Sequence, residues 1–223
     1  MFGLHLADCN IMAAKKNWAV DIQPLLKKYK GKKHPLKSHN IYQLMVMVVL
    51  SARSTDEHIN AIAPAFFSAY KDMAALSKAR AAGLFPLLKG VTNFAHKADW
   101  LVRIAQQVKS NRGIPMDMEG LTELPGIGRK SANVILRGAG RPPEGVMVDI
   151  HTIRVVGRLG ITKEEDPGKI EEKLMKVLPR EEWDAGMAMS FLGREICRPK
   201  PLCDICLMKD VCAYYQKVVK KGG

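Results

Sequence analysis

A lysine and an aspartate placed nineteen residues apart carry the most distinctive chemistry in this sequence. Lys130 ends the string Leu-Pro-Gly-Ile-Gly-Arg-Lys, and Asp149 opens the string Asp-Ile-His-Thr-Ile-Arg. A cation is disfavoured in the first turn of a helix, which favours the neutral amine, and a neutral lysine is a nucleophile capable of Schiff-base chemistry. A carboxylate fixed in direction can stabilise a developing positive charge. Position alone favours plainer roles: a phosphate contact for Lys130 and a helix N-cap for Asp149.

Two glycines precede Lys130 and predict an anion site. Gly126 and Gly128 stand one residue apart, with Arg129 at the expected start of the next helix. Such a turn and a helix N-terminus present backbone N–H groups that bind phosphate. Contacts of this kind position a nucleic-acid backbone without reading its sequence.

Four cysteines lie within sixteen residues, at Cys197, Cys203, Cys206 and Cys212, whereas Cys9 stands alone. The N-terminus has neither the basic start nor the apolar run of a signal peptide, so we expect an intracellular, reducing compartment. Clustered thiolates there indicate a metal site. Their spacing suits either tetrahedral zinc or a 4Fe–4S cluster, and spacing alone favours zinc because zinc sites built from four cysteines are common.

The charge balance points to a polyanionic partner. The 223 residues carry 35 Lys and Arg against 22 Asp and Glu, a net charge of +13. Nucleic acid is the partner we expect first, with solubility alone as the other explanation. The longest apolar run, Leu44–Leu50, is far too short to span a membrane.

Helical periodicity dominates the elements that must position these residues. Apolar residues recur at helical spacing over 97–108, 170–178 and 183–196, and Ser54-Thr-Asp-Glu57 reads as a capping box that opens another helix. No sustained strand-like alternation occurs. The pattern predicts an all-α fold of about ten helices.

Several motifs together resemble the endonuclease III family of helix-hairpin-helix DNA glycosylases, over residues of about 20–218. They are Leu50-Ser-Ala-Arg-Ser-Thr-Asp56, Thr92-Asn-Phe-Ala-His-Lys-Ala98, the hairpin through Lys130, Val148-Asp-Ile-His-Thr-Ile-Arg154, and the cysteines followed by Tyr214-Tyr215. The resemblance implies a six-helix domain at 32–142, with 1–31 and 143–223 forming a cluster domain whose four-cysteine loop is at 197–212.

The resemblance also implies residue roles. Lys130 would be the nucleophile and Asp149 the essential carboxylate of a glycosylase that also nicks abasic sites by β-elimination. The cysteines would hold a 4Fe–4S cluster, although their first spacing of five residues is one shorter than the family's usual six. Lys200 and Lys209 would contact phosphates. The expected partner is damaged double-stranded DNA, bound by a monomer in the cytoplasm or nucleoid of a prokaryote, with no membrane.

Two departures from the family pattern leave the lesion open. Arg53 stands where the family has glutamine, and Asn93 stands near the position of an apolar wedge, and both would contact DNA. Oxidised pyrimidines are the default substrate, with alkylated purines or mismatched uracil and thymine as alternatives. Adenine-specific relatives lack the hairpin lysine. A non-catalytic DNA-binding protein with structural zinc would explain the charge, the turn and the cysteines, but not the pairing of Lys130 with Asp149.

Overall fold

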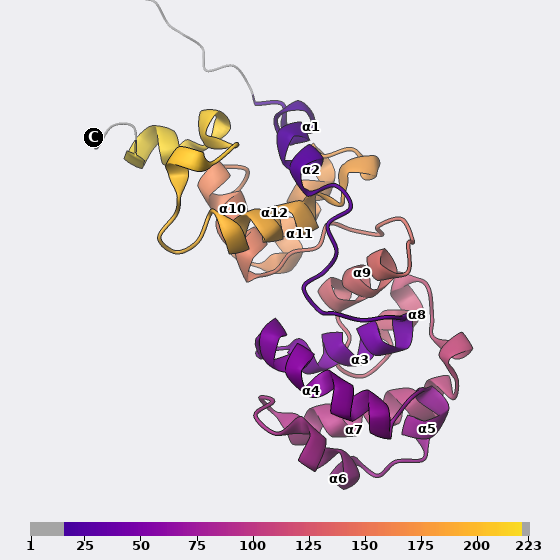
Figure 1. The fold of residues 1–223 in the computed structure, drawn as a ribbon. Coiled ribbons are helices and arrows are strands. Elements are labelled where there is room, and N and C mark those ends of the chain that lie inside the picture. The colour runs from indigo at the N-terminus through magenta and orange to yellow at the C-terminus, as the bar shows by residue number, and fades with distance from the viewer. Residues whose placement is uncertain (1–15, 220–223) are drawn as a thin grey trace, which may run out of the picture.

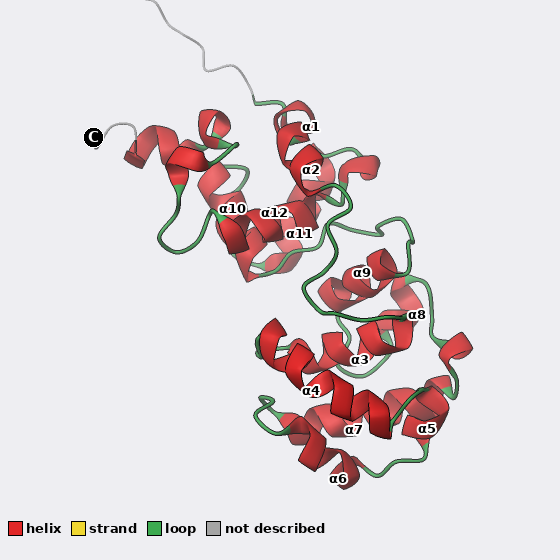
Figure 2. Ribbon diagram, viewed as in Figure 1, coloured by secondary structure: helices red, strands yellow, loops and turns green. Residues whose placement is uncertain are grey.

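The computed structural model describes residues 16–219, which form helices and loops without a strand (Figures 1 and 2). The predicted all-α fold is therefore confirmed, while Cys9 lies outside the described residues. The α-helices are α1 (Trp18–Asp21), α2 (Gln23–Tyr29), α3 (Ile41–Ser51), α4 (Asp56–Ala69), α5 (Met73–Ser77), α6 (Ala81–Leu84), α7 (Phe94–Val108), α8 (Met118–Thr122), α9 (Arg129–Gly138), α10 (Ile150–Leu159), α11 (Pro167–Val177) and α12 (Ala185–Glu195).

The helices gather into two groups joined by two connecting segments (Figure 1). Helices α3 to α9 form one group, in which α3 packs against α4, α7 and α9. The other contains α1, α2 and α10 to α12, with α12 packed against both α2 and α10. The chain passes from the second group to the first before α3, and it returns after α9.

Helix α3 lies at the centre of the larger group because its sequence is apolar on all sides. All of its residues from Leu44 to Leu50 are buried, as is Tyr42. A helix that is hydrophobic all round has to be enclosed by other elements. Asn40 caps its start by accepting a hydrogen bond from the backbone N–H of Gln43 at 2.9 Å.

Helix α4 begins one residue later than the capping box predicts. The N-cap is Thr55, whose hydroxyl accepts from the backbone N–H of His58 at 3.2 Å, and Ser54 lies outside the helix. The prediction of Ser54 as the cap was wrong by one residue, because the Ser54 hydroxyl instead accepts from the N–H of Thr92 at 3.3 Å.

Two glycines on one face of α12 allow its backbone to approach the segment before α10 and the start of α10. A Cβ on Gly186 would lie 2.4 Å from the carbonyl oxygen of Met147, and one on Gly193 would lie 2.8 Å from the Cβ of His151. Since the two glycines are seven residues apart, they share a face of the helix. This close approach fixes the backbone on both sides of Asp149.

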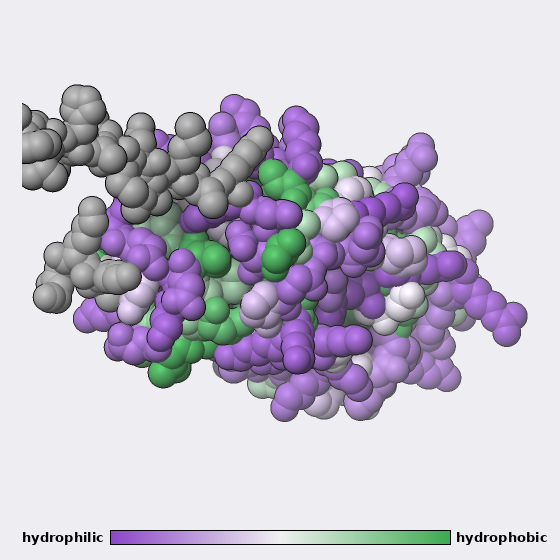
Figure 3. Space-filling model, turned by 90° about the horizontal axis from the view of Figure 1, so that it is seen from above, coloured by the Kyte–Doolittle hydropathy of each residue, from purple (hydrophilic) through white to green (hydrophobic). Residues whose placement is uncertain are grey.

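The surface of the described residues is mostly hydrophilic in the view of Figure 3, with small, separate hydrophobic patches. None of the helices between residues 16 and 219 combines the length and hydropathy that crossing a bilayer requires.

We expect Gly186→Ala to destabilise the protein by about 2–3 kcal/mol, because a methyl group would meet backbone atoms that cannot move aside locally. Urea denaturation measures the change. Gly157→Ala is the matched control: it lies in α10 with nothing within 4 Å of the added carbon. That control should gain roughly 0.5–1 kcal/mol from its better helix propensity. Wild-type stability of Gly186→Ala would contradict the close approach.

Candidate active site

Asp149 caps α10 and is held by hydrogen bonds on both carboxylate oxygens. Its Oδ1 accepts from the backbone N–H groups of His151 (2.9 Å) and Thr152 (2.8 Å) and from the Thr152 hydroxyl at 3.1 Å. Its Oδ2 accepts from the hydroxyl of Ser190 on α12 at 2.7 Å. The N-cap interpretation therefore holds, and the carboxylate is fixed in direction as well.

The same contacts keep this carboxylate ionised although its side chain is only 8% exposed. Burial raises the pKa of Asp149 and is the largest single effect, but the hydrogen bonds from Ser190 and Thr152 and the charges of His151 and Lys130 together outweigh it. The net effect is a pKa below the usual value for aspartate. Lys130 lines the same hollow as Val148, the residue directly before Asp149, so the fold brings Lys130 close to the start of α10.

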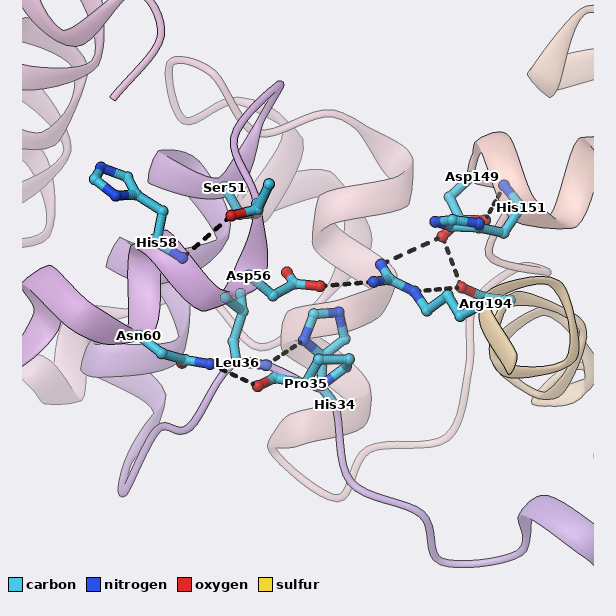
Figure 4. Close-up of polar contacts among 12 residues, drawn as sticks. His34, Pro35, Leu36, Ser51, Asp56, His58, Asn60, Asp149, His151 and Arg194 are labelled. Carbon is cyan, nitrogen blue, oxygen red and sulfur yellow. Dashed lines mark hydrogen bonds and ion pairs between the residues drawn. The ribbon is translucent and has the colours of Figure 1, made fainter. Parts of the chain in front are cut away.

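Arg194 connects Asp149 with the other helix group (Figure 4). Its guanidinium donates through Nη1 to Oδ2 of Asp56, at the start of α4, at 2.7 Å. Its Nη2 lies 3.9 Å from Oδ2 of Asp149, and its Nε contacts the Ser190 hydroxyl at 3.5 Å. One cation of α12 thus bridges two carboxylates that belong to different groups of helices.

Lys130 is exposed in the first turn of α9, directly after the hairpin turn. The turn requires glycine at Gly126, which has a φ of 77° and would place a Cβ 2.4 Å from the Trp100 ring. Gly128 caps α9, and a Cβ there would meet nothing within 4 Å, so the helix N-terminus lies open. Lys130 and Gly128 line one hollow together with Val148.

Arg129 is held differently from Lys130. Its Nε and Nη2 donate to the two carboxylate oxygens of Glu171 on α11, at 3.0 and 2.8 Å. This bidentate ion pair joins the hairpin to the second helix group. The Glu171 side chain is only 10% exposed, so Arg129 neutralises a mostly buried charge.

Arg53 and Asn93 lie on two loops that touch each other. The Thr92 hydroxyl donates to the carbonyl oxygen of Arg53 at 2.9 Å, and Arg53 and Asn93 have positive φ values of 59° and 54°. Sequence reasoning missed Phe94, which is 41% exposed beside Asn93 and stacks edge-on against Phe85 with centroids 5.1 Å apart. An exposed aromatic pair therefore adjoins these loops.

Lys97 ties the two loops together from inside. Its ammonium is buried and donates to the carbonyl oxygens of Leu50 at 2.8 Å and Ala52 at 2.5 Å. Burial lowers the pKa of Lys97 to about 8.

The four cysteines line one small cavity, whose other walls include Ile196, Leu202 and the two tyrosines after the last cysteine. Arg158 organises the loop from α10 by donating to the carbonyl oxygens of Arg198 (2.6 Å) and Pro199 (3.0 Å). Lys209 lines the same cavity, whereas Lys200 is exposed on the loop.

The donor chemistry of this cavity fits a metal group. Burial raises the pKa of the Cys203 and Cys206 thiols, and the charges of the neighbouring cysteines raise both further. Four thiolates side by side repel one another unless a bound cationic group compensates their charge. In the described part of the chain, no three His, Cys, Asp or Glu side chains are grouped to hold a single metal ion.

A family model described as the HhH-GPD superfamily of base excision DNA repair proteins matches residues 46–180. The chain belongs to this superfamily. Endonuclease III of Synechocystis sp. is 37% identical over 206 residues, covering 90% of this chain and 94% of that protein. Endonuclease III of Thermotoga maritima is 34% identical, covering 81% and 86%. The resemblance inferred from the motifs is thus confirmed.

Solved structures of the superfamily share the fold of this chain. A trapped covalent intermediate of endonuclease III with DNA superposes with a TM-score of 0.79 at 28% identity, covering 89% of this chain and 95% of that one. A non-covalent endonuclease III–DNA complex gives the same values. The predicted helix-hairpin-helix glycosylase fold is confirmed by this agreement.

We expect Ser190→Ala to lower the stability at pH 7 by about 1–2 kcal/mol, because it removes a hydrogen bond to a buried charge. The pKa of Asp149 is lowered in the folded state, so its stabilisation is present above the unfolded pKa and is lost as the pH falls through the folded pKa. The cost of the substitution should therefore shrink in acid. Urea titrations at pH 7 and pH 3 measure this, with Ser190→Thr as the conservative control. An equal cost at both pH values would contradict the expectation.

Proposed function

We propose that this protein is a DNA glycosylase of base excision repair that also nicks abasic sites, with Lys130 as the nucleophile and Asp149 as the charged partner. The observation that carries the proposal is their arrangement: an exposed lysine beside an open helix N-terminus lines one hollow with Val148, the residue directly before a buried carboxylate that hydrogen bonds hold in place. Membership of a base excision repair superfamily supports it.

The proposed reaction needs the damaged nucleotide to leave the base stack, because its glycosidic carbon is inaccessible within a duplex. The Lys130 amine attacks C1′, the bond between C1′ and the base breaks, and its electron pair leaves with the base. The lysine nitrogen then loses one proton. Its electron pair forms the C1′=N bond of a protonated Schiff base while the C1′–O4′ bond breaks and O4′ takes up a proton, which opens the sugar ring. This imine acidifies the C2′ proton, and β-elimination expels the 3′ phosphate.

Asp149 acts in this scheme as a charge stabiliser. Its lowered pKa makes it a weak base, whereas a permanent negative charge near C1′ stabilises the positive charge that develops on the sugar. Its four hydrogen bonds prevent the carboxylate from reorienting.

Damaged double-stranded DNA is the proposed partner. The open N-terminus of α9 and the Gly126–Gly128 turn supply backbone N–H groups for a phosphate. The loops of Arg53 and Asn93, which touch each other, would enter the DNA duplex at the lesion. The two helix groups would correspond to domains at 32–142 and at 1–31 with 143–223.

The four cysteines would hold a 4Fe–4S cluster, as the resemblance to endonuclease III implies. Bound there, the cluster would supply structural order rather than reaction chemistry. Arg158 already fixes the carbonyl groups of this loop. Lys209 and the exposed Lys200 would then present their charges to DNA phosphates.

Substitutions of Lys130 and Asp149 separate their proposed catalytic roles from DNA binding and helix capping. Lys130→Gln should abolish borohydride trapping on abasic DNA and nicking, while binding stays largely intact because at most one phosphate contact is lost. Asp149→Asn should cut base release by on the order of 10²–10³ and retain the cap, since asparagine also caps helices. Single-turnover assays measure both. Lys173→Gln on α11 is a control with the same charge change. Wild-type trapping by Lys130→Gln would leave Lys130 as a phosphate contact only.

Replacing a cluster ligand tests the cofactor. Cys203→Ala should lose iron and destabilise the loop, because ligation contributes to folding. Metal analysis and the yellow-brown absorbance of the purified protein measure this. Stoichiometric zinc without iron or sulfide, in protein made with ample iron, would show a structural zinc site instead.

A further inference from the structure

A large cavity opens between the two helix groups. It measures about 910 Å³, and Leu44, Val134, Met147 and Met187 form apolar parts of its wall. Val134 follows Lys130 by four residues on α9, so the two side chains lie on the same face of that helix. Lys130 itself lines a neighbouring hollow that shares Asn133 with this cavity, so a nucleobase released from a sugar at Lys130 would have the cavity within reach.

His34 lines this cavity from the segment between α2 and α3. Its Nδ1 accepts a hydrogen bond from the backbone N–H of Leu36 at 3.2 Å (Figure 4). In a neutral imidazole, an acceptor at one nitrogen places the proton on the other. The Nε2–H of His34 is therefore a donor, and it has no hydrogen-bond partner among residues 16–219.

The surroundings keep this imidazole neutral. The pKa of His34 is lowered to about 4, chiefly by burial; the charges of Lys130, Arg194 and Arg137 also lower it, against the opposing effect of Asp56. Figure 4 shows the ring beside the Asp56–Arg194 pair. At neutral pH the ring is a hydrogen-bond donor of fixed tautomer without a charge.

We propose that His34 recognises the excised base by donating a hydrogen bond from Nε2 to a carbonyl oxygen of a pyrimidine, which rests on the proposed glycosylase function. A departing pyrimidine keeps the electron pair of the glycosidic bond, and the resulting negative charge spreads onto its carbonyl oxygens. A fixed N–H donor stabilises that charge more in the transition state than in the intact nucleotide. The inference favours oxidised or deaminated pyrimidines over alkylated purines as substrates.

Two substitutions of His34 separate the donor from its structural contact. His34→Asn keeps an oxygen near the position of Nδ1 for the Leu36 N–H but removes the distal donor. His34→Gln carries an amide donor near the position of Nε2. We expect His34→Asn to slow release of thymine glycol and uracil by roughly 10- to 100-fold, and His34→Gln to restore part of that loss.

The readout is the ratio between two single-turnover rates on the cluster-bearing protein: base release and nicking of a ready-made abasic site. The abasic site has no base carbonyl, so its nicking should change by less than the base release in His34→Asn. Lys173→Gln is the control, since Lys173 is exposed on α11 and does not line this cavity. It should leave both rates unchanged.

Other outcomes would overturn the inference. Equal losses of nicking and base release in His34→Asn would make the role of His34 structural, and unchanged base release would exclude the contact. Release of alkylated purines alone by the wild-type protein, unaffected by His34→Asn, would also contradict it. Failure of the proposed function is seen separately, because wild-type protein would then neither nick abasic DNA nor form the borohydride-trapped complex.

Discussion

A buried carboxylate stays ionised only if its neighbours replace the water it has lost, and Asp149 imposes that requirement on much of this fold. The start of α10 supplies two backbone N–H groups, Thr152 and Ser190 supply hydroxyls, and Arg194 supplies a cation. The glycines of α12 allow Ser190 and Arg194 to come close enough for these contacts. The ionised state of Asp149 therefore depends on the close packing of α12 against α10.

Arg194 extends this arrangement across the space between the helix groups. Its pair with Asp56 holds the start of α4 next to the start of α10, and the Arg129–Glu171 pair makes a second ionic connection from the hairpin to α11. Each pair includes a carboxylate side chain that is largely buried, at 13% and 10% exposure. Ion pairs of this kind cost most when one partner is removed, so they favour a single relative position of the hairpin and the Asp149 helix.

Local patterns in the sequence were enough to predict the helices and the motif residues. The apolar spacing over 97–108 and 170–178 corresponds to α7 and α11, and Asp149 was expected as a cap because cap chemistry involves neighbours two or three residues away. Ser190, Arg194 and His34 could not be found in the same way. Ser190 and Arg194 pair with residues tens of positions away, and the charges that act on His34 also come from distant segments; no local periodicity encodes such pairings. The Ser54 error has the same cause, since the partner of its hydroxyl is on another loop.

The charges around the cleft explain why a neutral histidine belongs there. The charges of Lys130, Arg194 and Arg137 lower the pKa of His34, and the charge of Asp56 opposes them. A protonated His34 would add repulsion against these cations and would weaken the attraction between Arg194 and its two carboxylates. A neutral imidazole supplies a directed donor without that cost. The cleft thus places a reactive amine next to the helix N-terminus, where a phosphate and a reacting sugar would meet it, and an uncharged donor farther inside, where the base would leave.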